Sequence, residues 1–141
     1  QVAPQLRTRI SQADVEQIQA LFEIVPWEAF KPQRRLLLNP DFKVRGTAVG
    51  AADADLVLDD TLVDIKTRKE SRLDDGDVHQ IVGYAPLAGR VGITGHEGLL
   101  DLTHGGIYQA RAGVLHTFAI ADCIAEEDRE RLLEALLDFE G

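Results

Sequence analysis

The sequence predicts an α/β protein in which helices flank a mixed β-sheet, and it predicts one domain over all 141 residues. Three observations support this class. Apolar residues recur at helical spacing after Ser11, two strand-like runs meet at Asp59 and Asp60, and residues 126–139 form an amphipathic helical pattern. The expected order is helix, strand, hairpin, helix, strand, strand, helix.

The first helix begins after Ser11, a typical N-cap residue, and Pro26 ends it. Its apolar positions are spaced for one helical face. They are Val15, Ile18, Leu21, Phe22 and Val25. A connector follows over residues 27–32. The run of leucines at 36–38 predicts a short buried strand, closed by Asn39 and Pro40.

The second half of the chain alternates helix and strand. A turn at 74–76 opens a helix at about 77–88, and two strands at 107–110 and 114–121 turn at 112–113. The last helix, 126–139, directs its leucines inward. We expect helix 77–88 to be a crossover that returns the chain to a strand beside the hairpin.

The hairpin between Asp53 and Lys66 carries the most informative pattern. With Asp59 and Asp60 as a two-residue turn, Asp55 lies opposite Asp64. The other predicted pairs are Leu58 with Thr61, Val57 with Leu62, Leu56 with Val63, Ala54 with Ile65, and Asp53 with Lys66. A four-residue loop keeps this register, whereas a three-residue loop would divide the acids between the two faces.

In this register one face gathers charged residues and the other gathers apolar ones. The charged face holds Asp53, Asp55, Asp64 and Lys66. The apolar face holds Ala54, Leu56, Leu58, Val63 and Ile65, and we expect it to pack against the core. Opposed acids repel unless a cation offsets them, and Mg²⁺ prefers carboxylate oxygens. A metal there would position and acidify a water beside the lysine. The alternative is a hairpin whose polar face is simply solvated.

These residues resemble a known signature. Asp55, followed by Asp64-Ile65-Lys66, resembles the bipartite motif of the PD-(D/E)xK nuclease superfamily, and Gln80 with Tyr84 resembles the Q-x-x-x-Y motif of its RecB-like branch. The resemblance implies a restriction-endonuclease-like αβββαβ core. It also implies Mg²⁺- or Mn²⁺-dependent hydrolysis of phosphodiester bonds in DNA, in repair, recombination or defence against foreign DNA.

The resemblance also implies a role for each residue. Asp55 and Asp64 would be metal ligands, with the backbone carbonyl of Ile65, and Lys66 would be the catalytic lysine. Gln80 and Tyr84, one helical turn apart and on the same face as Asp77, would reach toward the site. An acid on the first helix is common in the superfamily. Glu16 and Glu23 are the candidates, and Glu23 is our expected ligand.

The chain departs from the family pattern in three respects. Ala54 stands where a proline usually precedes the first aspartate, no histidine occurs before His79, and the cysteines of the iron–sulfur members are absent. The single Cys123, expected as a small buried hydrophobe, fits a reducing cytoplasm. No apolar run is long enough to span a membrane.

Net charge leaves two functions open. A formal charge of −9 is unusual for a nucleic-acid binder, although seven of the 24 acids lie in residues 126–140. Basic residues flank the hairpin and could follow phosphates. They are Lys31, Arg34, Arg35, Lys43 and Arg45 before it, and Arg68, Lys69 and Arg72 after it. The expected function is a metal-dependent deoxyribonuclease whose specificity could come from a protein partner. The alternative is a catalytically silent domain of this fold that binds nucleic acid or protein.

Overall fold

A five-stranded mixed sheet forms the centre of the computed structural model, which describes residues 11–42, 54–69 and 72–139. The strands lie side by side in chain order, and all neighbours are antiparallel except β3 and β4, which are parallel. The strands are β1 (Leu36–Leu38), β2 (Leu56–Leu58), β3 (Thr61–Lys66), β4 (His104–Gln109) and β5 (Val114–Ala119).

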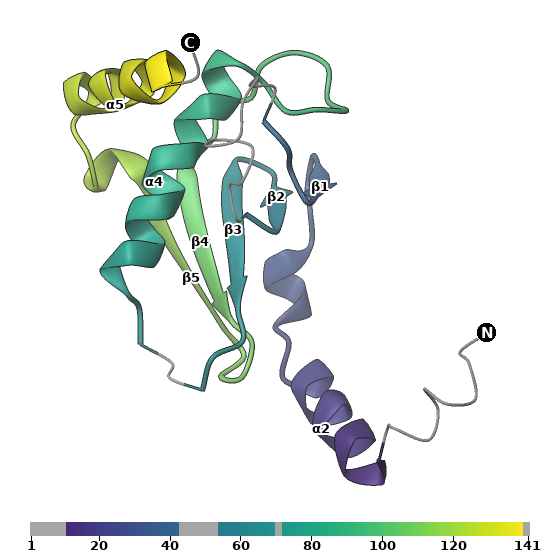
Figure 1. Cartoon of the computed structure of the whole chain (residues 1–141). Coiled ribbons are helices and arrows are strands. Elements are labelled where there is room, and N and C mark those ends of the chain that lie inside the picture. The colour runs from purple at the N-terminus through teal and green to yellow at the C-terminus, as the bar shows by residue number, and fades with distance from the viewer. Residues whose placement is uncertain (1–10, 43–53, 70–71, 140–141) are drawn as a thin grey trace.

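Within the described residues three α-helices accompany the sheet, which confirms the predicted α/β class. They are α2 (Gln12–Glu23), α4 (Asp75–Arg90) and α5 (Glu126–Phe139), with short 3₁₀ turns η1 (Trp27–Phe30) and η2 (Ile120–Asp122). Figure 1 shows α4 lying along β3 and β4, α5 crossing the far end of α4, and α2 standing away from the sheet. The helix α4 is the predicted crossover between the parallel strands β3 and β4. None of the described helices is long and apolar enough to cross a membrane.

Local sequence signals explain where the helices begin. Ser11 and Asp14 form a capping box at the start of α2, each side chain accepting the other residue's backbone N–H. Asp74 caps α4 by accepting the N–H of Gly76. This helix is longer than the predicted 77–88 at both ends, and it accommodates Pro86 within its last turns.

The hairpin has the predicted register. Leu56 pairs with Val63, Val57 with Leu62, and Leu58 with Thr61, around the two-residue turn. Asp59 adopts a left-handed conformation with φ of 54°, which aspartate tolerates better than most residues. Its carboxylate accepts backbone N–H groups just before β1, and these bonds lower the pKa of Asp59. The turn is therefore fixed to the strand beside it.

The expectation for the hairpin's apolar face was wrong in part. The larger core lies on the face that carries Asp55, Asp64 and Lys66, here called the carboxylate face, because α4 packs there over Val57 and Leu62. Side chains alternate along a strand, so these two apolar residues share a face with the acids. Ala54, expected on the other side, also packs against this larger core.

The opposite side of the sheet, here called the open face, holds a smaller cluster of Leu58, Val63 and Tyr108. Ile65, expected to pack inward, keeps 37% of its surface exposed on that face. β1 is an edge strand rather than the predicted buried strand, and Leu38 is 69% exposed. Cys123, expected to be buried, is exposed as well.

Strand β4 begins at His104, three residues before the predicted strand, and runs through Gly105 and Gly106. The pair of glycines obscured the strand pattern in the sequence. Gly105 has no room for a side chain, since a Cβ there would lie 2.4 Å from the ring of Phe118 and 2.6 Å from Ile81. The missing side chain lets α4 and β5 approach the parallel pair closely.

Candidate functional site

Asp55 directly precedes β2, and its N–H, its carbonyl and its carboxylate each form a hydrogen bond. Its N–H donates to Val63 O at 3.0 Å, and its carbonyl accepts the N–H of Asn39 at 2.8 Å. Its carboxylate Oδ2 accepts the N–H of Ile65 at 2.6 Å. The regular ladder ends at Leu56 and Val63, and Asp55 then bonds to the residues on both sides of Asp64. The two predicted aspartates are thus brought together.

Asp64 lies within β3 under the start of α4, and only 4% of its surface is exposed. Burial and the adjacent Asp55 carboxyl together raise the pKa of Asp64 to about 6, although Lys66 acts in the opposite direction. The structure therefore holds one carboxylate that gives up its proton only near neutral pH, beside another carboxylate.

Lys66 supplies the positive charge at this point. Its Nζ lies 2.8 Å from Asp64 Oδ2 and 3.5 Å from Asp77 Oδ1. The Asp64 carboxylate raises the pKa of Lys66, so the ammonium form is stabilised. Lys66 Nζ is the charged partner of Asp64 Oδ2, which receives no further hydrogen bond within the described part of the chain. The predicted cluster of Asp55, Asp64 and Lys66 exists as a compact group.

Asp77 joins this group, which sequence reasoning did not predict. It is 8% exposed in the first turn of α4 and pairs with both Lys66 and Arg68. Its spacing of three and seven residues from Gln80 and Tyr84 marked it as sharing their helical face, and that spacing was the available signal. The site is therefore a row of alternating charges that connects the hairpin to the crossover helix.

Gln109 is the second residue that the sequence did not reveal. It pairs with Lys66 across the parallel strands and is 4% exposed. Its Oε1 lies 3.0 Å from His116 Nε2 on β5, while its own Nε2 has no hydrogen-bond partner among the residues described. Buried amide groups are usually satisfied. A polar residue ending an apolar strand was the only sequence signal.

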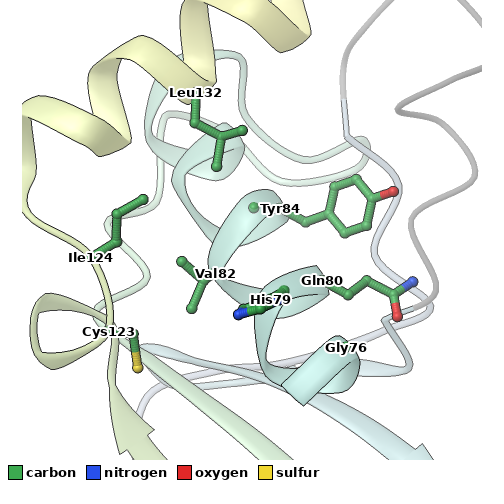
Figure 2. A pocket seen from close by; sticks show the side chains of 9 residues that line it. Gly76, His79, Gln80, Val82, Tyr84, Cys123, Ile124 and Leu132 are labelled. Atoms are coloured by element: carbon green, nitrogen blue, oxygen red, sulfur yellow. The ribbon is translucent and has the colours of Figure 1, made fainter. Parts of the chain in front are cut away.

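Gln80 and Tyr84 share one side of α4, as predicted. Figure 2 shows both side chains leaving the helix in the same direction, one turn apart. The Tyr84 ring stacks on Phe42, with ring centroids 6.5 Å apart and an angle of 23° between the planes. They also border a cavity of about 710 Å³ that reaches His79 and Cys123. The cavity lining does not include the two aspartates or Lys66.

Glu23 and Glu16 are exposed on α2. Within residues 11–42, 54–69 and 72–139, no three Asp, Glu, His or Cys side chains gather as a metal cage. The structure therefore does not bring either glutamate together with Asp55 and Asp64. Asp53, the fourth member of the predicted charged face, lies outside the described residues, as do Lys43 and Arg45.

Comparisons with protein-family models, with curated proteins and with solved structures found no match for this chain.

Proposed function

We propose that this chain is a Mg²⁺- or Mn²⁺-dependent nuclease domain of the PD-(D/E)xK type that hydrolyses phosphodiester bonds of DNA. The observation that carries the proposal is the group formed by Asp55, Asp64 and Lys66, with Nζ 2.8 Å from Asp64 Oδ2. The order of one helix, three strands, a helix and a further strand supports the same αβββαβ core. Neither the fold class nor the net charge alone would single out this chemistry.

The donor set fits a hard divalent cation. The pKa of Asp64 is raised mainly by burial and further by repulsion from the adjacent Asp55 carboxylate. A bound cation would offset both effects, and Asp64 Oδ2, which Lys66 Nζ approaches at 2.8 Å in this structure, would be a ligand atom. Asp55, Asp64 and the carbonyl of Ile65 would hold the ion, with water completing its shell because Mg²⁺ keeps several waters. The ion supplies Lewis-acid polarisation of a phosphoryl oxygen.

The protein's own groups have separable tasks. Asp64 must be ionised to hold the cation, which favours activity above about pH 6. Lys66 would turn from Asp64 toward the charge that develops on the phosphoryl group. Its ion pair with Asp77 would hold the ammonium near the site during this movement. The exposed Lys69 and Arg72 follow β3 and could contact the DNA backbone. Gln80 and Tyr84 would contact the strand that is cut.

The test is cleavage of single- and double-stranded DNA in Mg²⁺ and Mn²⁺, with EDTA as the control for the metal. We expect cutting by the wild-type chain and none by Asp55→Asn or Asp64→Asn. Asp60→Asn is the matched control, because Asp60 lies in the same hairpin but pairs with Arg34 away from the group. Cutting that persists in Asp64→Asn or in EDTA would exclude the proposed site.

One observation favours a second candidate, a catalytically silent domain of this fold that binds nucleic acid or protein. Lys66 and Arg68 already pair with Asp64 and Asp77, so protein cations neutralise the buried acids without a metal. The two candidates differ in their response to metal. A nuclease site binds Mg²⁺ in the folded state and raises the melting temperature, whereas a site closed by ion pairs does not.

A further inference from the structure

Helix α2 presents an apolar stripe that remains largely exposed. No residue of this helix is buried, and Ile18 and Phe22 are each 63% exposed. Val15 lies on the same side, three and seven residues before them. An amphipathic helix normally buries such a stripe. The helix therefore has an amphipathic pattern, but the described part of the chain leaves most of its apolar side uncovered.

A surface of that kind lies on the open face of the sheet. A groove of about 350 Å³ runs across β1 to β4, and every residue that lines it is apolar or aromatic. Its principal residues are Trp27, Phe30, Leu36, Leu38, Ile65 and Tyr108. Contiguous exposed apolar surface marks an interaction site, and a groove of this kind accepts an amphipathic helix through residues spaced like those of α2.

Charge complementarity and continuity connect the helix to the groove. α2 carries Asp14, Glu16 and Glu23 and no basic residue. Lys31 directly follows the groove residue Phe30, and Arg35 directly precedes the groove residue Leu36. Neither cation forms a salt bridge within the described ranges. The ring of Phe22 also contacts Trp27, with centroids 4.8 Å apart, so the stripe runs directly into the groove edge.

Apart from the contact of Phe22 with Trp27 at the edge, α2 does not line its own groove. Residues 24–26 join α2 to Trp27, and Val25 already lines the groove. Pro26 disfavours a helical conformation at Val25, so α2 ends before the groove instead of continuing along it. A second copy of the chain offers the same groove without that restriction. Because both partners would carry helix and groove, the exchange closes with two-fold symmetry.

We propose that two copies of this chain form a dimer in which α2 of each copy lies in the open-face groove of the other. Phe22 and Ile18 enter the groove near Leu38 and Ile65, and the acids of α2 meet Lys31 and Arg35. The interface uses the face opposite Asp64 and Lys66, so it leaves the carboxylate face free. The proposal goes beyond the nuclease function and does not depend on it.

Light scattering coupled to size-exclusion chromatography tests the oligomeric state of the whole chain. We expect a dimer for the wild type and monomers for Phe22→Lys and for Leu38→Lys, with unchanged circular dichroism because both side chains are exposed. Ala20→Lys, placed opposite the apolar stripe on the same helix, is the matched control and stays dimeric. A monomeric wild type, or a dimer that survives both groove and helix variants, overturns the proposal.

Disulfide trapping then tests the arrangement. In a Cys123→Ser background, chains with Phe22→Cys are mixed with chains with Leu38→Cys under mild oxidation. We expect the mixed disulfide between the two kinds of chain. A dominant disulfide between two Phe22→Cys chains would show a helix-to-helix dimer instead and would overturn the proposed exchange.

Discussion

The two faces of the sheet differ in the kind of side chain that they bury and the kind that they expose. On the carboxylate face, α4 buries Asp64 and Asp77 beside apolar residues, and Lys66 and Arg68 offset their charges. On the open face, apolar side chains such as Leu38 and Trp27 remain exposed, and the groove that they line contains no charged residue. The first face holds charge that would be more stable in water, and the second exposes surface that would be more stable out of water. Both departures from ordinary stability point to function.

The largest effect we expect is on cleavage. Lys66→Met removes the ammonium that Asp64 and Asp77 hold in place, and it should lower the rate of DNA cleavage by about 10²–10³-fold, the usual loss for one charge-stabilising donor. Single-turnover cleavage in Mn²⁺ measures it. Arg90→Met, which removes a cation that pairs with Glu130 on α5 and was not assigned to DNA, serves as the control and should retain the wild-type rate. Equal losses in both variants would contradict a specific role for Lys66.

A pair of core substitutions compares the packing of the two faces. Leu62→Ala removes a fully buried side chain beneath α4 and should lower the unfolding free energy by about 2–5 kcal/mol. Leu38→Ala on the open face should change it by about 0.5 kcal/mol or less in the monomer. Urea denaturation at low protein concentration measures both. Similar losses would mean that the open face is packed and that the comparison fails.

The pH dependence of stability tests the strain at Asp64. The pKa of Asp64 is raised from 3.8 to about 6, so the folded state binds this proton more tightly than the unfolded state. The contribution of Asp64 is therefore most favourable below 3.8 and is lost as the pH rises through about 6. Asp64→Asn should raise the metal-free unfolding free energy by about 2 kcal/mol at neutral pH and by little in acid.

Denaturation series at several pH values, with EDTA present, give this difference. Asp60→Asn again provides the comparison, since Asp60 belongs to the same hairpin but lies outside the buried group. A difference between Asp64→Asn and wild type that does not change with pH would contradict the assignment of the raised pKa.

The smallest effect concerns Ile65, which contacts Asp55 through its backbone. Its N–H donates to Asp55 Oδ2, while its side chain points to the open face. Ile65→Thr keeps the β-branched shape and the backbone group, so cleavage should stay within about twofold of wild type and stability within about 0.5 kcal/mol. A large loss of cleavage would assign the side chain a role that this geometry does not give it.

The sequence predicted the hairpin well because two independent signals agreed there. The turn at Asp59 and Asp60 and the alternation of side chains both require Leu56 to face Val63. The same alternation brings Asp55 toward Asp64 and Lys66. The bounds of α5 were predicted as the structure has them, because its acidic first turn and its leucine spacing give a complete helical pattern.

The sequence could not show which face of the hairpin α4 would cover. A period of two distinguishes two faces but does not state which one receives a helix. Asp77 and Gln109 join the site only through the crossover, which brings residues 11 and 43 positions beyond Lys66 beside it. The exposed side of β1 was missed for the same reason, since three leucines in a row fit a covered strand and an uncovered groove equally well.

Binding of Mn²⁺, measured by titration calorimetry above and below about pH 6, tests the central claim most directly, because Asp64 must be ionised to act as a ligand. We expect the wild-type chain to bind Mn²⁺ at the higher pH and more weakly at the lower pH. Asp64→Asn should abolish binding, and Asp60→Asn should leave it unchanged. No binding by the wild type, or equal binding by Asp64→Asn, would contradict a metal site formed by Asp55 and Asp64.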